Sequence, residues 1–190
     1  MGLDFSEDYL CVCGGAAKDA QVEFFRERLY VAAEEMAKKK RKVVCCGAAT
    51  GVIGLFQDFL KEFDVPVVGA FAEDELANKH SGVKDFKTFL SYSERQSYLL
   101  QNFSHFLFLP GGLGTFHEFF SLLALPFAGL DATQAKEIKI TCLDMMGWRF
   151  IKNGLENSVF CGLIPPKSLG NITFWDPLAP PSSKKNTEEF

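Results

Sequence analysis

The chain of 190 residues is 47% apolar, contains 20 phenylalanines and has a formal net charge of −4 at pH 7. This composition supports a domain with a substantial core and excludes a disordered protein, a nucleic-acid-binding protein and, because no apolar run approaches ~20 residues, a membrane-spanning one. The N-terminus is acidic, whereas a secretory signal begins basic and then turns apolar. We therefore expect a cytoplasmic protein with neither nucleic acid nor membrane as a partner.

Apolar runs without polar alternation indicate buried parallel strands, and apolar residues three and four positions apart indicate helices. In the first half of the chain we predict strands at 9–13, 43–46, 65–70 and 85–90, with helices at 19–40 and 55–60. In the second half we predict strands at 105–109, 137–143 and 171–175. The helices there are expected at 91–103, from the third glycine-rich turn to about 125, and at 148–156. Residues 71–85 have no clear period and are interpreted as a loop with a short helix.

The alternation of strands and helices predicts an α/β fold, a doubly wound parallel sheet with helices on both faces. We assign it to a single domain at residues 1–176, since no repeat or second domain is evident. Residues 177–190 are rich in Pro, Ser, Lys and Glu and are expected to form a disordered tail.

Three glycine-rich turns follow predicted strands, at residues 14–15, 47–54 and 110–115. Because the carboxyl ends of parallel strands meet at one edge of a sheet, the turns are predicted to line one nucleotide-sized crevice. Glycine lets the backbone approach a phosphate, and a helix N-terminus attracts anions. The predicted residues for binding the phosphate and the rest of the nucleotide are Gly14, Gly47, Gly51, Gly111, Gly112, Gly114 and Thr115.

The turns do not match the common nucleotide motifs. Residues 47–54 are not a G-x-G-x-x-G pattern, and no P-loop lysine follows Gly114, which weighs against dinucleotide binding and nucleoside triphosphate hydrolysis. A Ser or Cys nucleophile elbow is missing from the sequence. The six cysteines lie mostly in apolar, strand-like runs without zinc-motif spacing, so we expect no metal.

Glu118 follows the third glycine turn and has two interpretations. Thr115-x-x-Glu118 fits a capping box, in which the carboxylate only satisfies the start of a helix. A carboxylate beside a phosphate turn also suggests chemistry on a phosphorylated small molecule. Arg95 is similarly ambiguous, because Ser91-x-x-Glu94 marks a helix start and the arginine then fits an ordinary exposed helix charge.

The segment Pro110-Gly111-Gly112-Leu113-Gly114-Thr115-x-x-Glu118 resembles the P-G-G-x-G-T-x-x-E signature of the LOG family. These proteins are cytokinin riboside 5′-monophosphate phosphoribohydrolases, long mislabelled as lysine decarboxylases. Ser93-Glu94-Arg95 resembles the family's M-H-E-R-K segment in order and spacing. Gly51-Val52-Ile53-Gly54 and Cys13-Gly14-Gly15-Ala16 resemble its G-L-M-G and C-G-S-S turns, and the similarity spans roughly residues 9–177.

The resemblance implies a Rossmann-like fold, a homodimer, and Arg95 and Glu118 as the catalytic pair. The implied reaction is hydrolysis of the N-glycosidic bond of a nucleoside 5′-monophosphate, such as a cytokinin ribotide or AMP, to free base and ribose 5-phosphate. That reaction requires no metal or organic cofactor. The chain departs from the family pattern where Tyr92-Ser93 replaces Met-His, Gln96 replaces Lys, Ala49 replaces Ser and His117 replaces Glu.

Two other interpretations remain open. A non-enzymatic nucleotide or cofactor carrier, resembling the molybdenum-cofactor carrier proteins, would keep the glycine turns without needing Arg95 and Glu118 together. An NAD-type oxidoreductase would bind a nicotinamide cofactor. The hydrolase interpretation differs from both because it requires the arginine and the glutamate to meet in one site.

Overall fold

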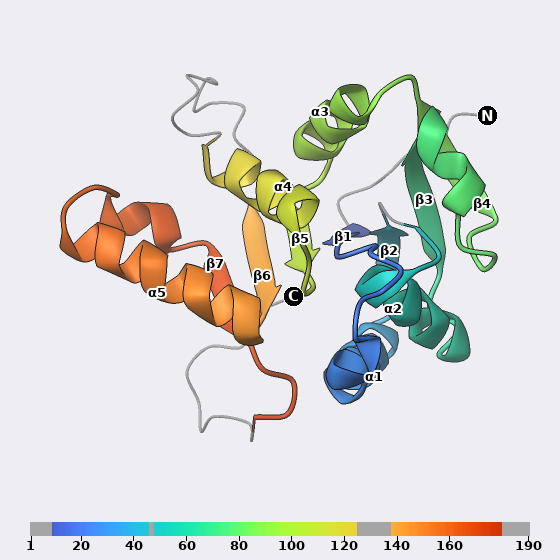
Figure 1. Ribbon diagram of the computed structural model, residues 1–190, viewed down its shortest axis with the longest axis horizontal. Coiled ribbons are helices and arrows are strands. Elements are labelled where there is room, and N and C mark those ends of the chain that lie inside the picture. Colours follow the sequence, from blue (N-terminus) through green and yellow to red (C-terminus); the bar gives the residue numbers. More distant parts are fainter. Residues whose placement is uncertain (1–8, 46–47, 125–137, 180–190) are drawn as a thin grey trace.

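The computed structural model describes residues 9–45, 48–124 and 138–179. In this part of the chain, seven parallel strands form one sheet in the order β4-β3-β2-β1-β5-β6-β7 (Figure 1). The strands are β1 Tyr9–Cys13, β2 Lys42–Cys45, β3 Val67–Ala72, β4 Asp85–Phe89, β5 His105–Phe108, β6 Lys139–Leu143 and β7 Ile172–Trp175. Each predicted strand is present. The five inner strands are largely buried on both faces of the sheet, whereas the edge strands β4 and β7 are more exposed.

The helices connect successive strands. They are α1 Arg26–Lys38, α2 Gly51–Glu62, α3 Tyr92–Asn102, α4 Leu113–Ala124 and α5 Met146–Phe160, with short 3₁₀ segments η1 Val22–Phe25, η2 Glu73–Asn78 and η4 Pro166–Leu169. The predicted helix at 19–40 is shorter in the structure, since its first apolar residues form η1. Helices α2 and α4 begin earlier than predicted, within their glycine-rich turns.

The helices cover both faces of the sheet (Figure 1). Leu10 and Val12 of β1 pack into a cluster with α1 and α2, whereas Cys11 and Cys13 pack into a second cluster with α3, α4 and α5. Neighbouring residues of a strand point to opposite faces, so one strand supplies both cores. The predicted doubly wound parallel sheet is confirmed.

The strand order reverses at β1, which pairs with β2 on one side and β5 on the other. The connections leaving the carboxyl ends of β1 and β5 therefore diverge, and in open α/β sheets this switch point is where ligands commonly bind. Within the described ranges, no helix is both long and apolar enough to cross a bilayer. Gly47, the connector at 126–134 and tail residues 180–190 lie outside the described residues.

Helix α1 ends with a left-handed residue that is not glycine. Lys40 has a φ of 52°, and the Arg41 amide donates to the Met36 carbonyl at 3.0 Å, as in a Schellman motif. Because a side chain is strained in this conformation, we expect Lys40→Gly to raise the free energy of unfolding by about 0.5–1 kcal/mol, measured by urea denaturation. Lys38→Gly, at the last residue of the helix, should instead lower it, because glycine disfavours a helix and the ion pairs of Lys38 with Glu34 and Glu35 are lost. A loss of stability in Lys40→Gly would contradict the strain argument.

Candidate functional site

The three glycine-rich turns meet at the carboxyl edge of the sheet. The Gly15 amide donates to the Pro110 carbonyl at 3.0 Å, which joins the turns that follow β1 and β5. The Ile53 amide, at the start of α2, donates to the Gly15 carbonyl at 3.1 Å. Gly51 has a φ of 70°, and a Cβ there would lie 2.5 Å from the Gly15 carbonyl oxygen, so only glycine fits. The turns containing Gly14, Gly51 and Gly111 thus lie together at one edge of the sheet, as predicted.

The N-terminus of α4 is open toward solvent. The helix begins at Leu113, so the first amides, including those of Gly114 and Thr115, have no partners within the helix. A Cβ at Gly112 or Gly114 would meet no described atom within 4 Å. At Gly111, by contrast, a Cβ would clash with Thr115 at 2.1 Å from its Oγ1, so this residue fixes the close packing of the turn. The amides and the helix dipole can accept an anion here.

Thr115 is not the helix cap that the sequence suggested. The Phe116 amide donates to the Gly112 carbonyl at 3.0 Å, so Gly112 holds the N-cap position and Thr115 lies in the first turn. The capping-box interpretation of Thr115 and Glu118 is therefore wrong. The predicted start of α3 is confirmed, since the Ser91 side chain accepts from the Glu94 amide at 3.2 Å.

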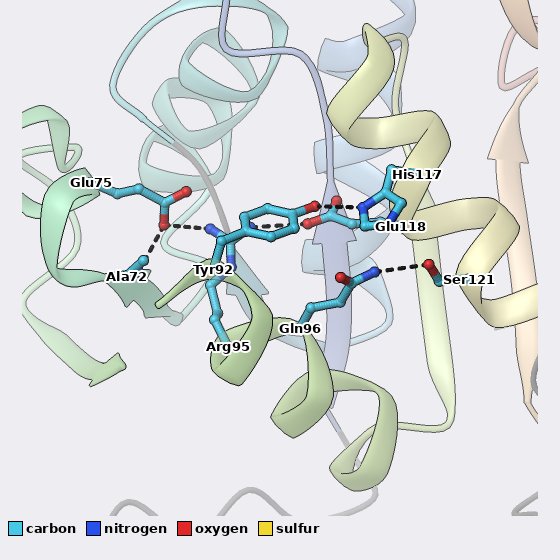
Figure 2. Close-up of polar contacts among 8 residues, drawn as sticks. All are labelled: Ala72, Glu75, Tyr92, Arg95, Gln96, His117, Glu118 and Ser121. Carbon is cyan, nitrogen blue, oxygen red and sulfur yellow. Dashed lines mark hydrogen bonds and ion pairs between the residues drawn. The ribbon is translucent and has the colours of Figure 1, made fainter. Parts of the chain in front are cut away.

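Glu118 points toward Arg95 between helices α4 and α3 (Figure 2). Arg95 Nη2 donates to Glu118 Oε1 at 3.1 Å, and Arg95 Nη1 donates to Glu75 Oε2 at 2.5 Å. The side chains of Arg95 and Glu118 are 2% and 11% exposed. Glu75 belongs to η2, and its carboxylate also accepts from the Ala72 amide at 2.8 Å at the end of β3. The structure thus brings the two predicted catalytic residues together and adds a second carboxylate to Arg95.

The interpretation of Arg95 as an ordinary exposed helix charge is wrong. Its two terminal nitrogens each contact a carboxylate, and its guanidinium carbon lies 4.7 Å from the centre of the Tyr92 ring. A buried cation must be paired, and the planar fork of arginine holds two carboxylates in fixed directions. In this arrangement Arg95 orients Glu118 and is not exposed for direct contact with a phosphate.

Tyr92 and His117 form an aromatic pair beside the ion pair. Tyr92 Oη lies 3.5 Å from His117 Nδ1, and the two rings are 6.0 Å apart with an interplanar angle of 28°. Burial, and then the negative charge of Glu118, raise the pKa of Tyr92 to about 12. The phenol therefore remains a neutral hydrogen-bond donor at physiological pH.

Sequence reasoning missed Glu75 as part of the site. Glu75 lies in the irregular segment at 71–85, and no motif singles it out among the other acidic residues there. The described residues include no group of three or more His, Cys, Asp or Glu side chains placed to hold a metal ion.

The structure defines a Rossmann-like α/β protein whose three glycine-rich turns meet at the carboxyl edge of the sheet. No protein-family model matches the chain. Over 140 residues it is 29% identical to the cytokinin riboside 5′-monophosphate phosphoribohydrolase of Rhodococcoides fascians, a match that covers 72% of this chain and 69% of that protein.

Two solved structures share the fold. The molybdenum cofactor binding protein of Rippkaea orientalis has a TM-score of 0.64 and 14% identity, covering 90% of this chain and 91% of that one. The molybdenum cofactor carrier protein of Chlamydomonas reinhardtii has a TM-score of 0.64 and 13% identity, covering 90% and 92%. At these identities the likeness establishes the fold alone.

Proposed function

We propose that the protein hydrolyses the N-glycosidic bond of a nucleoside 5′-monophosphate, releasing the free base and ribose 5-phosphate. The observation that carries this proposal is the buried Arg95–Glu118 pair, one turn below the open N-terminus of α4. The 29% identity with a phosphoribohydrolase supports the same reaction class. A cytokinin ribotide and AMP are the substrates we expect first.

The spacing along α4 suits a nucleotide. At a rise of about 1.5 Å per residue, Glu118 lies about 7.5 Å along the helix from Leu113. That is the scale that separates the 5′-phosphate of a nucleotide from its glycosidic bond. A phosphate held by the amides of Leu113, Gly114 and Thr115 would bring the ribose alongside Glu118. The fixed phosphate would then lower the entropic cost of orienting the sugar.

The negative charge of Glu118 suits cleavage of an N-glycosidic bond. As the bond from the anomeric carbon to the base nitrogen lengthens, the sugar gains oxocarbenium character. The Glu118 carboxylate, oriented by Arg95, would stabilise this cation and take a proton from the attacking water. The hydroxyl joins the anomeric carbon, and the electron pair of the broken bond stays on the base.

The decisive assay incubates purified protein with AMP, isopentenyladenosine monophosphate and other nucleoside monophosphates. Free base and ribose 5-phosphate are followed by chromatography. We expect release of base from at least one of these nucleotides. Folded protein that releases no base from any of them would contradict the hydrolase proposal.

Gly112 offers a test of the phosphate site. A Cβ at Gly112 meets no described atom within 4 Å, and its φ is not left-handed. Gly112→Ala should therefore lower the free energy of unfolding only by about 1 kcal/mol, because alanine caps a helix less well than glycine. The added methyl group would occupy the space of a phosphate on the α4 amides. The KM for AMP should therefore rise at least about tenfold, since amide hydrogen bonds to a charged group are lost.

The matched control is Gly154→Ala in α5, where an added Cβ also meets no described atom within 4 Å. It should leave the KM unchanged. Steady-state kinetics of both variants make the comparison. An unchanged KM in Gly112→Ala would place the phosphate away from the α4 N-terminus.

The shared fold with two molybdenum-cofactor proteins favours a second candidate function. In this alternative, the protein is a non-enzymatic carrier of a nucleotide or of the molybdenum cofactor. It predicts that ligand binds at the glycine turns and leaves unchanged. Calorimetry with AMP, combined with the assay above, separates binding without turnover from hydrolysis.

A homodimer remains a prediction. Leu113 at the start of α4 is 88% exposed, and an apolar side chain at this position would suit a subunit contact. Light scattering coupled to size-exclusion chromatography measures the mass in solution. A monomeric mass at micromolar concentration would contradict the dimer.

A further inference from the structure

The aromatic pair Tyr92 and His117 has no role in the reaction as proposed so far. Tyr92 is the first residue of α3, and His117 immediately precedes Glu118 on α4. In Figure 2 the Tyr92 ring lies in front of the contact between Arg95 and Glu118, with its hydroxyl directed toward His117. The pair therefore lies next to the atoms that the proposed reaction uses.

The two rings differ in their access to solvent. His117 is exposed, whereas Tyr92 is partly buried and covers one face of the Arg95 guanidinium at 4.7 Å from its ring centre. The 3.5 Å separation between Tyr92 Oη and His117 Nδ1 is at the outer limit of a hydrogen bond. A proton taken up from water at His117 thus has a short path to a hydroxyl beside Glu118.

The departing base needs a proton that Glu118 is badly placed to supply. The Arg95 guanidinium favours the ionised form of Glu118. An ionised carboxylate can stabilise the sugar cation and accept a proton from the attacking water, but it has no proton to give to the base. The base leaves with the electron pair of the broken bond, so an acid on its side lowers the barrier. Tyr92 stays protonated, since burial and Glu118 raise its pKa to about 12. A phenol with so high a pKa is a weak acid by itself, so it can act as the immediate donor only if a second group replaces its proton in the same step.

We propose that His117 and Tyr92 form a proton relay that protonates the departing base, an inference that rests on the hydrolase function proposed above. Imidazolium Nδ1–H of His117 donates its proton to Tyr92 Oη as the Tyr92 hydroxyl proton passes to the base nitrogen. That nitrogen keeps the electron pair of the broken bond. The imidazole regains its proton from solvent, so neither residue is consumed.

The test compares AMP with 4-nitrophenyl ribofuranoside 5-phosphate, whose leaving group departs without protonation. In Tyr92→Phe and His117→Gln, kcat/KM for AMP should fall about 10²-fold, while kcat/KM for the nitrophenyl substrate should change less than about twofold. Because His117 is exposed, His117→Gln should fold normally, and it provides the test if Tyr92→Phe folds poorly. Tyr30→Phe on α1, whose ring packs on Phe59 of the core on the other face of the sheet, is the matched control and should leave both substrates unaffected.

Equal losses on both substrates would show that the pair only shapes the site, and no loss on AMP would show that it is not used; either result overturns the relay. Glu118→Gln should lower turnover of both substrates, which distinguishes the two roles. A wild-type protein that releases neither nitrophenol nor the base of any nucleoside monophosphate tested would instead refute the hydrolase function, and the relay with it.

Discussion

Replacing Glu118 with glutamine should lower kcat for nucleoside monophosphate hydrolysis by about 10³-fold while leaving nucleotide affinity nearly unchanged. Glutamine keeps the shape of the side chain but removes the negative charge that, in the proposed reaction, faces the sugar cation. The proposed phosphate contacts at the α4 amides do not involve this charge. Release of base measures kcat, and calorimetry with AMP measures affinity.

The matched control is Glu62→Gln at the exposed end of α2, which should leave both quantities unchanged. If wild type and Glu118→Gln bind AMP equally and neither releases base, the result supports the carrier interpretation and contradicts the hydrolase. If Glu118→Gln hydrolyses AMP as fast as wild type, another group performs the chemistry.

Replacing Arg95 with methionine should lower the free energy of unfolding by about 3–5 kcal/mol, the largest stability effect that we expect in this protein. Methionine fills most of the volume but leaves the buried Glu118 carboxylate without its cation. Glu75 also loses Arg95 as a partner, but its side chain is 35% exposed, so water can solvate its charge. Urea denaturation at pH 7 measures the loss.

Arg26→Met provides the control, because Arg26 is also paired with a glutamate but its side chain is 50% exposed. Its effect should be much smaller, because water screens an exposed ion pair. Adding Glu118→Gln to Arg95→Met should recover part of the stability, since the unpaired charge is then removed. A loss as small as that of Arg26→Met would show that the pair is not effectively buried.

The strands could be predicted from the sequence, whereas the starts of α2 and α4 could not. A strand buried on both faces needs an unbroken apolar run, as at 105–108, and this signal is local. Helix α4 starts at Leu113 between two glycines, where intrinsic propensity argues against a helix. Packing of α4 on the sheet, through residues such as Phe119, overrides that local preference.

The candidate site was only partly accessible to sequence reasoning. Arg95 and Glu118 were found through their motifs, but their burial and mutual contact depend on how α3 and α4 pack. Glu75 contacts Arg95 from an irregular segment 20 positions away in the chain. Such a contact produces no periodic pattern in the sequence from which it could be predicted. The proximity of Tyr92 and His117 likewise required the tertiary structure.

Arg95 also connects the two halves of the sheet. Glu75 follows β3 on one side of the strand-order reversal, and Glu118 follows β5 on the other, so the guanidinium bridges the crevice that β1 and β5 open. Widening the crevice there would require separating an arginine from one of its carboxylates. The width of the candidate site is therefore set by charge as well as by packing. An anionic ligand bound there would change the electrostatic field that acts on Arg95, and with it that width.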